Sequence, residues 1–350
     1  MKEKSVMDYL DPGEVLQRVG EWPLLDVRTP SEYRQGHIPG ALNLPLFSDE
    51  ERVEVGTLYK QVSPEKAFLR GLDFAGARMR WYVEEARRMA PEGKAILHCW
   101  RGGDRSGSLA WLLAFSGFEV LVLRGGYKAY RNLIFSQFAE RSLPLLVLGG
   151  PTGSGKTLIL KALRALGEQV IDLEQLARHK GSAFGALGEL SQPTVEQFEN
   201  DLHAYVGNLD DGRRIWVENE SRAIGRVFQP EGFWKQLIHA PLIELERNFQ
   251  DRVRYLVEEY ACFPKEDLME AFGRLRKRLG GQNVTAAIEA IEIGDFAGAA
   301  EIALQYYDKS YRYATENKAD FQQVWKFPTS GLLEEEIAQR LVELADTNGI

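Results

Sequence analysis

The chain has 350 residues, of which 44% are hydrophobic and 27% are charged, with a formal net charge of −8. This length predicts two domains, each large enough for its own hydrophobic core. The sequence contains no run of eighteen apolar residues and no secretory signal, so we expect a cytoplasmic protein without a membrane partner. The negative charge excludes a protein that coats nucleic acid through a broadly basic surface, but it allows one basic face.

Two cysteines, Cys99 and Cys262, are too few for a disulfide framework and indicate a reducing compartment. Cys262 falls in a predicted helix over residues 258–263, and we expect it in the core. The sequence has no cysteine and histidine spacing typical of zinc, so no metal ligand set of that kind is predicted.

The first 140 residues alternate between apolar strands and helices. Residues 24–28 form a short predicted strand, after which Ser31 is placed to cap a helix. Further strands are expected at 95–98 and 119–123, with a helix over 106–116 between them. This alternation predicts a parallel sheet, with the loop after the strand 95–98 at the carboxyl edge of that sheet.

That loop lies in residues 98–107, which read HCWRGGDRSG, and it is the strongest candidate for a reactive site. Its glycines allow backbone N–H groups to point inward and its arginines add positive charge, so the loop favours a thiolate at the cysteine. The pattern predicts catalytic roles for Cys99, Arg101 and Arg105. The rest of the anion-binding loop is predicted to comprise Trp100, Gly102, Gly103, Asp104 and Ser106.

The spacing within this loop leaves more than one chemistry open. Five residues separate Cys99 from Arg105, which matches the H-C-x5-R-S pattern of cysteine-dependent phosphatases. A loop of this size suggests an anion larger than a lone sulfur atom. A phosphatase also needs a general acid for its leaving group, and Asp104 is the candidate for that role.

The second region begins with an apolar strand over residues 143–149 and a glycine-rich segment over residues 150–157, which reads GPTGSGKT. A predicted helix over residues 158–166 follows, so this phosphate-loop motif has its required strand–loop–helix setting. Backbone N–H groups and the helix N-terminus would bind a diphosphate there, and Thr157 could ligate a magnesium ion. The predicted phosphate-binding residues are Gly150, Gly153, Ser154, Gly155, Lys156 and Thr157.

Acidic residues accompany two other predicted strands of this region. Residues 214–218 end in Glu218, with Glu220 close behind, and residues 170–174 contain Asp172. Carboxylates at such strand ends hold the metal ion in many nucleotide-binding proteins. We therefore expect Asp172, Glu218 and Glu220 to act as an acid, as metal ligands or as substrate contacts.

Two basic segments are candidates for contact with RNA, although a solvated surface explains each of them equally simply. One lies in the loop 176–185 and the other ends a predicted helix over residues 266–279. Their basic residues are Arg178, His179, Lys180, Arg274, Arg276, Lys277 and Arg278. Helices are also predicted over 283–293 and 296–318, where residues 306–313 mix tyrosines with basic residues in a pattern that suits base stacking or helix packing.

Four segments of the first region resemble a rhodanese domain, in the order of that family: residues 26–28 (DVR), 36–41 (GHIPGA), the cysteine loop and 124–127 (RGGY). In that family the loop cysteine carries a transferable sulfur or selenium, which implies this role for Cys99. The resemblance also implies a structural role for Asp26 and Arg28. Many rhodaneses have one residue fewer between the cysteine and the arginine of the loop.

Both regions together resemble the tRNA 2-selenouridine synthase family, whose pattern includes the longer cysteine loop. Beyond the two loops, the resemblance rests on residues 181–185, 218–225 and 306–309. It implies a transferase that alkylates wobble-position 2-thiouridine in tRNA with geranyl diphosphate and then replaces geranylthiol with selenium from selenophosphate. The implied partners are tRNA and, as the donor source, selenophosphate synthetase; no tightly bound cofactor is implied.

The expected fold is an α/β chain, with a rhodanese-like parallel-sheet domain over residues 1–140 and a P-loop NTPase-like domain over residues 141–350 whose C-terminal part is helical. Two other functions stay open at this point. A cysteine phosphatase joined to a kinase-like domain would account for the cysteine loop. A nucleotide-dependent RNA-binding protein without catalysis would account for the phosphate loop. The sequence makes no prediction of oligomeric state. From anion size and loop chemistry, we expect residues 150–157 to bind the diphosphate of geranyl diphosphate and the cysteine loop to bind selenophosphate.

Overall fold

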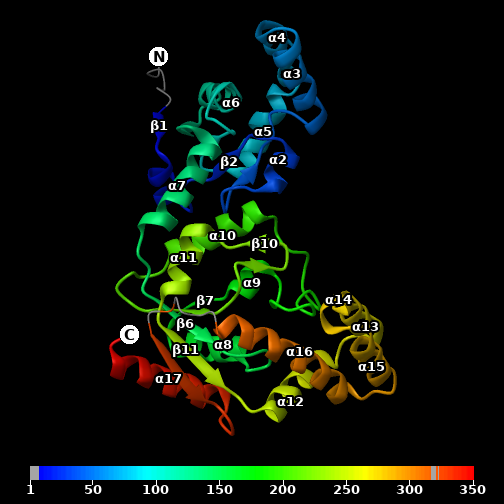
Figure 1. Ribbon diagram of the computed structural model, residues 1–350. Coiled ribbons are helices and arrows are strands. Elements are labelled where there is room, and N and C mark those ends of the chain that lie inside the picture. The colour runs from blue at the N-terminus through cyan, green and yellow to red at the C-terminus, as the bar shows by residue number, and fades with distance from the viewer. Residues whose placement is uncertain (1–7, 317–320, 322) are drawn as a thin grey trace. The chain divides into compact units, whose positions relative to one another are not determined.

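The computed structural model describes residues 8–316, 321 and 323–350 of the chain (Figure 1). The chain divides into two compact units, Met1–Gln137 and Phe138–Ile350. Each unit is built on its own five-stranded sheet.

The first unit alternates strands and helices. Its elements in chain order are β1 (Asp8–Leu10), α1 (Pro12–Arg18), β2 (Leu24–Asp26), α2 (Pro30–Gln35), β3 (Leu42–Asn43), α3 (Asp49–Gln61), α4 (Pro64–Gly76), α5 (Met79–Met89), β4 (Lys94–His98), α6 (Asp104–Phe115), β5 (Glu119–Leu123) and α7 (Gly126–Glu140).

Every pairing in the sheet of the first unit is parallel, and the strand order is β1-β5-β4-β2-β3. The central strand β4 is almost wholly buried. Helices α5 and α6 cover one face, where Tyr82 and Ala86 from α5 join Leu109 and Leu113 from α6 in one apolar cluster with the strands. Because β4 is central, the cysteine loop that follows it begins at the middle of the carboxyl edge of the sheet.

The start of α2 differs from the prediction. Its N-cap is Thr29, whose hydroxyl accepts a hydrogen bond from the Glu32 amide at 3.3 Å, and Pro30 occupies the first helical turn. Proline favours the first helical position, which moves the cap to the preceding residue. Ser31, predicted as the cap, instead donates to Asp49 at the start of α3, with 2.6 Å between the two oxygens.

The second unit has a mixed order of strands and helices. Its elements are β6 (Leu145–Gly149), α8 (Lys156–Ala165), β7 (Gln169–Ile171), α9 (Leu173–Ala177), α10 (Val195–Gly207), β8 (Ile215–Glu218), β9 (Ala223–Ile224), β10 (Val227–Phe228), α11 (Glu231–His239), β11 (Leu242–Glu246), α12 (Phe249–Tyr260), α13 (Lys265–Arg274), α14 (Arg276–Leu279), α15 (Gly281–Glu292), α16 (Phe296–Glu316), β12 (Val324–Pro328) and α17 (Glu334–Asn348).

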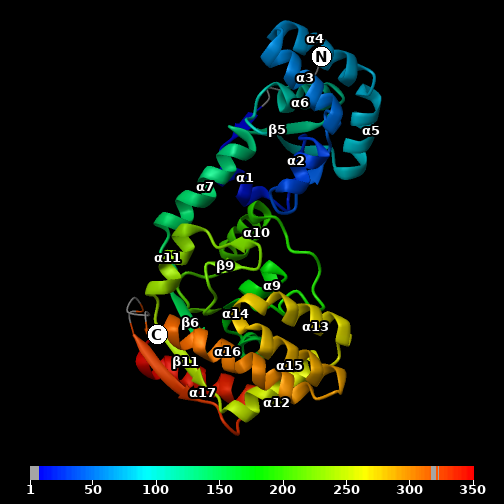
Figure 2. The same ribbon diagram turned by 45° about the vertical axis from the view of Figure 1, so that its right-hand side comes forward.

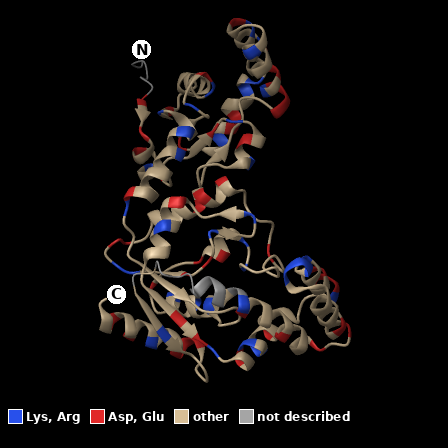
Figure 3. Cartoon of the chain, in the orientation of Figure 1, with Lys and Arg blue, Asp and Glu red and all other residues tan. Residues whose placement is uncertain are grey.

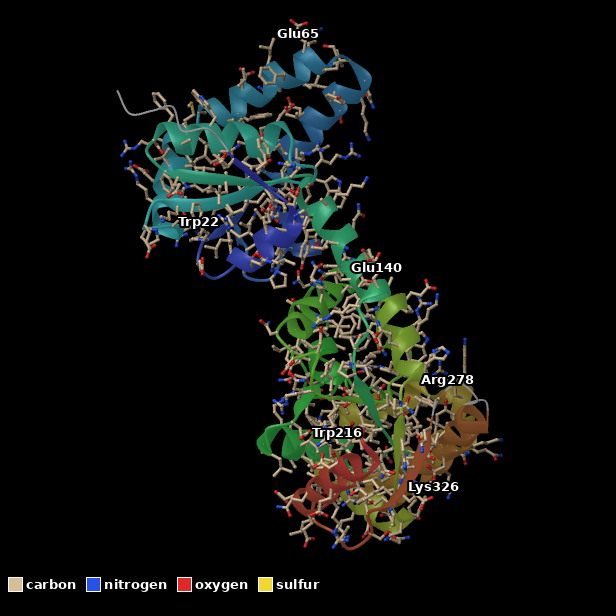
Figure 4. All side chains as sticks on the ribbon, turned by 90° about the vertical axis from the view of Figure 1, so that its left-hand side faces the viewer. Trp22, Glu65, Glu140, Trp216, Arg278 and Lys326 are labelled. Carbon is tan, nitrogen blue, oxygen red and sulfur yellow. The ribbon has the colours of Figure 1, made fainter. Side chains whose placement is uncertain are left out.

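The main sheet of the second unit is also parallel, with the order β12-β11-β6-β8-β7. Trp216 of β8 is fully buried within the unit (Figure 4). It shares an apolar cluster with residues of α8 and α17, including Leu160 and Leu341, so these two helices cover the same face. The edge strand β12 comes from the last part of the chain, after the helices α12 to α16.

Helices α13, α14, α15 and α16 form a separate layer with its own apolar cluster (Figure 2). Phe272 of α13, Val284 of α15 and Ala303 of α16 are buried in this cluster, together with Phe184 from the loop that follows α9. The predicted fold class is confirmed: two α/β units with parallel sheets, the second with a helical C-terminal region.

Two local predictions in the second unit are wrong. Residues 170–174 do not form one strand, because β7 ends at Ile171 and Asp172 caps the helix α9, accepting a hydrogen bond from the Gln175 amide at 2.8 Å. Cys262 is not a core residue, since α12 ends at Tyr260 and the cysteine lies exposed in the following turn.

No helix among the described residues is long and apolar enough to cross a membrane.

Candidate active sites

Cys99 is buried directly after β4, at the start of the loop that the sequence singles out. Two glycines allow the backbone to pack closely there. Gly102 has a φ of +66°, and a Cβ at Gly126 would lie 2.4 Å from the Cys99 carbonyl oxygen. The Tyr127 amide donates to that same carbonyl at 2.8 Å. The segment that follows β5 therefore packs against the cysteine loop, and this close approach explains the glycines at positions 102 and 126.

The surroundings of Cys99 favour the thiolate. Burial raises the pKa of the Cys99 thiol, but hydrogen bonds from the Ser106 hydroxyl and from the Arg101 and Ser106 amides, with the charge of Arg105, bring the pKa below its ordinary value. The Ser106 hydroxyl lies 3.3 Å from the Cys99 sulfur. The cysteine is therefore a candidate nucleophile at neutral pH.

Arg105 lies beside this sulfur and is held by a carboxylate. It makes two hydrogen bonds to Glu32 of α2, at 2.6 and 3.2 Å, and Glu32 has a pKa below its ordinary value because these bonds outweigh its burial. Arg52 of α3 lies near the same charged groups. Burial and the like charge of Arg105 lower the pKa of Arg52, and this effect outweighs the charges of Glu32 and Cys99, which raise it. The motif did not indicate Arg52, because α3 is distant in sequence.

Asp26 and Arg28, for which the sequence resemblance implies a structural role, are buried next to the cysteine loop. Arg28 is buried, donates to Asp26 at 2.6 Å and to the Gly36 carbonyl at 2.6 Å, and lies 3.8 Å from the centre of the Tyr127 ring. Trp100 packs against that same ring at 5.7 Å. This buried charge network fixes the loop rather than facing a substrate.

The remaining predicted loop residues lie at its outer side. Arg101 and Asp104 have exposed side chains, and Asp104 is the first residue of α6. Gly103 is the N-cap of that helix. The helix N-terminus thus adds its positive end to the loop, as expected of an anion site.

The phosphate loop of the second unit lies between β6 and α8, as predicted. Gly150, Gly153 and Gly155 all have positive φ, which lets the backbone wrap toward the N-terminus of α8. Lys156 donates to the Gly150 carbonyl at 3.3 Å, so its amine is folded back over the loop. Ser154 is buried.

Four carboxylates surround this loop. Thr157 donates to Glu174 at 3.3 Å, and the Glu174 amide donates to Glu218 at 2.8 Å. Burial and the nearby charges of Glu220 and Asp172 raise the pKa of Glu174 to about 8. Burial also raises the pKa of Glu218 and of Glu220, with the neighbouring carboxylates adding to the shift at Glu218. The structure thus brings the three predicted acids together and adds Glu174.

Two arginines that the sequence did not indicate also reach the phosphate loop. Arg247 follows β11, and its guanidinium lies 2.7 Å from where a Cβ at Gly155 would be. Arg252 of α12 is buried, donates to the Thr152 carbonyl at 2.8 Å and binds Asp308 of α16. Local motifs could not identify these residues, because the sheet order and the packing of α12 place them here.

The basic loop after α9 is mostly engaged within the protein. Lys180 pairs with Glu259 and lies 5.5 Å from the centre of the Tyr260 ring, and Arg178 donates to the Ser191 carbonyl at 3.3 Å. His179 is partly buried, and burial lowers its pKa. These contacts favour a structural role for this loop.

The basic run near α14 has a different character. Arg274, Arg276, Lys277 and Arg278 are all exposed, and they gather on adjoining turns (Figure 3). In the tyrosine segment, by contrast, Tyr306 and Tyr307 pack against the helical cluster, and the Tyr307 hydroxyl accepts a hydrogen bond from the Ala183 amide at 3.1 Å. The side chains of Arg312 and Tyr313 lie outside the described residues.

The two loops define a class of protein in which a domain with a buried cysteine in a glycine-rich loop is joined to an α/β domain with a phosphate-loop motif. Residues 11–133 match the rhodanese-like domain family. Residues 143–326 match the family described as the tRNA 2-selenouridine synthase AAA domain.

Relatives similar over most of the chain have the same description. The chain is 36% identical to the tRNA 2-selenouridine synthase of Sulfurovum sp. (strain NBC37-1) over 334 residues, covering 85% of this chain and 90% of that protein. It is also 36% identical to the protein of that name from Bdellovibrio bacteriovorus over 343 residues, covering 85% and 89% of the two chains. The chain belongs to the tRNA 2-selenouridine synthase family and is an enzyme of tRNA modification.

Proposed function

We propose that this enzyme converts 2-thiouridine at the wobble position of tRNA to 2-selenouridine in two steps, through an S-geranyl intermediate. Its substrates are geranyl diphosphate and selenophosphate, and selenophosphate synthetase is the source of the latter. A thiocarbonyl sulfur is a poor leaving group until alkylation allows it to leave as a thiolate. This requirement explains why one chain would need two anion sites.

The phosphate loop is assigned to the first step. The thiocarbonyl sulfur attacks C1 of the geranyl group, the C1–O bond breaks, and diphosphate leaves with the electron pair while the base loses its N3 proton. Lys156 and the loop amides stabilise the negative charge that develops on the leaving diphosphate. Arg247, next to Gly155, adds a second cation there.

A magnesium ion fits this site. The Thr157 hydroxyl and Glu218 are the residues that would hold it, since one Glu218 oxygen is buried without a hydrogen-bond partner. Magnesium commonly uses one or two protein ligands and takes the rest from phosphate and water. Bound there, it would neutralise charge on the diphosphate.

The cysteine loop is assigned to the second step. Selenium in selenophosphate is already fully reduced, so making a selenium–sulfur bond at Cys99 would require reduction of phosphorus. Attack of the Cys99 thiolate on phosphorus needs no redox change: the S–P bond forms and hydroselenide leaves with the P–Se electron pair. Water then hydrolyses the S–P bond to give phosphate. Arg105, Arg52 and Arg101 would hold the tetrahedral anion.

Hydroselenide then completes the exchange. It adds to C2 of the S-geranylated base, the C2–S bond breaks, and geranylthiol leaves with a proton. The proton of hydroselenide passes to N3, which gives 2-selenouridine, and water supplies the proton of geranylthiol. Cys99 in this scheme positions and releases the selenium without carrying it through a change of oxidation state.

The exposed basic run at residues 274–278 is assigned to tRNA. Its side chains are the predicted RNA-contact residues with the fewest contacts inside the protein, although Arg274 also pairs with Glu270 along its helix. Phosphate contacts of this kind add affinity without reading sequence.

The observation that supports the proposal best is the buried sulfur of Cys99 in a glycine-rich loop, 3.3 Å from the Ser106 hydroxyl and close to Arg105, where these neighbours lower the pKa of the thiol. Mass spectrometry of tRNA nucleosides after incubation with geranyl diphosphate, and then with selenophosphate, tests it. We expect S-geranyl-2-thiouridine after the first incubation and 2-selenouridine after the second. Absence of the geranylated nucleoside would contradict the two-step scheme, whereas release of phosphate from generic aryl phosphates would favour the phosphatase alternative.

A further inference from the structure

An apolar pocket with a volume of about 70 Å³ lies between α12, α13, α15 and α16 in the second unit. This volume is several times what one water molecule needs, roughly 10–15 Å³ by the same kind of measure, but it is less than the roughly 150 Å³ of a cavity that holds benzene. The pocket is partly open to solvent, so a longer hydrocarbon chain would lie partly inside it and partly along its mouth. Its walls include Phe184, Tyr260, Phe272, Phe296 and Ala303.

The few polar groups of the pocket are used by the protein itself. The Ser182 hydroxyl accepts a hydrogen bond from the Phe184 amide at 3.1 Å and lies close enough to the hydroxyls of Tyr260 and Tyr307 to counteract part of the rise in their pKa values. The Tyr307 hydroxyl also binds the Ala183 amide. A nucleoside or sugar would find few hydrogen-bonding partners here, whereas a hydrocarbon chain would need none.

One wall of the pocket belongs to the phosphate loop. Thr152 of that loop lines the pocket, as does Leu256 of α12. Leu256 also packs against the loop, because its Cγ lies 3.4 Å from where a Cβ at Gly153 would be. The carboxylate of Glu174, which binds Thr157, is close enough to Tyr260 to raise the pKa of that tyrosine along with its burial. An anion-binding loop and an apolar pocket therefore share a boundary.

We propose that this pocket binds the hydrocarbon tail of a prenyl diphosphate whose diphosphate head lies in the phosphate loop. An apolar pocket beside a loop built for diphosphate matches a ligand with an anionic head and an apolar tail. The inference rests on the proposed function for its choice of ligand, but tail binding is measurable without any transfer.

The test compares geranyl diphosphate with inorganic diphosphate by calorimetric titration of the full-length protein. Burial of a ten-carbon chain predicts that geranyl diphosphate binds at least about 100-fold tighter than inorganic diphosphate. Equal affinity of the two ligands would overturn the proposal.

A pocket-filling variant locates the tail. Ala300 of α16 lines the pocket and is only partly buried, so Ala300→Phe should fill it without disrupting the core. We expect geranyl diphosphate to bind about 10-fold more weakly, with less than a twofold change for inorganic diphosphate. The matched control is Ala297→Phe, on an exposed face of the same helix, which should change neither affinity. An unchanged affinity for geranyl diphosphate in folded Ala300→Phe would show that the tail lies elsewhere.

A pocket-enlarging variant gives a second, independent readout. Phe296 is partly buried at the start of α16 and lines the pocket. Phe296→Ala should shift the preference by about 10-fold from geranyl toward the longer farnesyl diphosphate. A preference that stays with geranyl diphosphate would count against the assignment.

Failure of this inference is distinguishable from failure of the proposed function. If wild-type enzyme geranylates tRNA while both pocket variants bind and transfer normally, the function holds and the pocket assignment is wrong. If the wild type binds geranyl diphosphate as predicted but never forms S-geranyl-2-thiouridine, the pocket assignment holds and the two-step function is wrong.

Discussion

The cysteine loop and the phosphate loop, which we propose to bind anions, both lie at the carboxyl edge of a parallel sheet, but their charges are balanced differently. Around Cys99, Arg105 and Arg52 lie near the carboxylate of Glu32. Around the phosphate loop, Lys156 and Arg247 face four carboxylates, three of which have raised pKa values, and a third cation, Arg252, is paired with Asp308.

This difference indicates what each site requires of its ligand. The cysteine loop already favours an anion, because its thiolate is stabilised by donors and by positive charge. The carboxylates of the phosphate loop repel one another until protons or a cation neutralise them. We therefore expect the first site to bind its anion alone, and the second to bind diphosphate together with magnesium.

Replacement of the nucleophile gives the largest expected effect. Cys99→Ala should reduce conversion of geranylated tRNA to selenouridine by about 10³-fold or more, since no other group at the site replaces a thiolate. Geranyl transfer should be unchanged, because we assign that step to the phosphate loop. The control is Cys262→Ala, at the exposed second cysteine, which should affect neither step. Normal selenation by Cys99→Ala would show that the cysteine loop is not a reactive site.

Removal of the phosphate-loop lysine tests the other side of the comparison. Lys156→Ala should slow geranyl transfer by about 10²–10³-fold while leaving selenation of pre-geranylated tRNA intact. Lys161→Ala, at an exposed position of the same helix α8, serves as the control. A loss of both steps in Lys156→Ala would argue against a division of labour between the loops.

The acidic cluster predicts a pH dependence of stability. Glu174 titrates near 8 in the folded protein and near 4.5 when unfolded, so the folded state binds more protons between these values. Stability contributed by the protonated form is fully present below pH 4.5 and is lost as the pH rises through 8. Glu174→Gln should therefore stabilise the protein at pH 8.5 by about 2 kcal/mol and flatten this dependence, measured by urea unfolding.

The matched control for this experiment is Glu335→Gln, an exposed carboxyl in the same unit. It should leave the slope of stability against pH unchanged. A Glu174→Gln protein with the same slope as the wild type would mean that burial and the neighbouring carboxylates do not raise the pKa of Glu174 as the structure implies.

The smallest expected effect is a change in the pKa of the Cys99 thiol. Ser106→Ala removes the hydroxyl that donates to Cys99, so the pKa of the thiol should rise by about one unit or less. The readout is the pH midpoint of Cys99 alkylation by iodoacetamide. Ser108→Ala, an exposed serine on the same helix, is the control. A midpoint that does not move would leave the amides and Arg105 as the main stabilisers of the thiolate.

Sequence signals predicted the strands and loops well where the structural requirement depends only on neighbouring residues in the chain. The glycines of both loops have positive φ or close backbone neighbours, and such requirements are visible in sequence. The strand over residues 119–123 has the predicted bounds, and the helix after the cysteine loop begins two residues early, since Asp104 and not Ser106 is its first residue.

Residues that reach the sites through tertiary packing could not be predicted. Arg52, Arg247 and Arg252 lie in no motif, and only the order of strands and the packing of α3 and α12 bring them to the loops. The same limit explains the tyrosine segment: Tyr307 is equally suited to stack on a base or to pack in a core, and its contact with Ala183 exists only in the folded chain. The apolar pocket depends on four helices at once.

The position of β12 has a consequence for the synthesis of the chain. Every strand of the first unit is complete by Leu123, so that sheet can form while the ribosome is still translating the second unit. Strand β11, however, gains its outer neighbour only when Val324–Pro328 has been made. Until then β11 presents an open edge on which a nascent chain can mispair. We therefore expect the second unit to depend more on chaperones during synthesis than the first unit does.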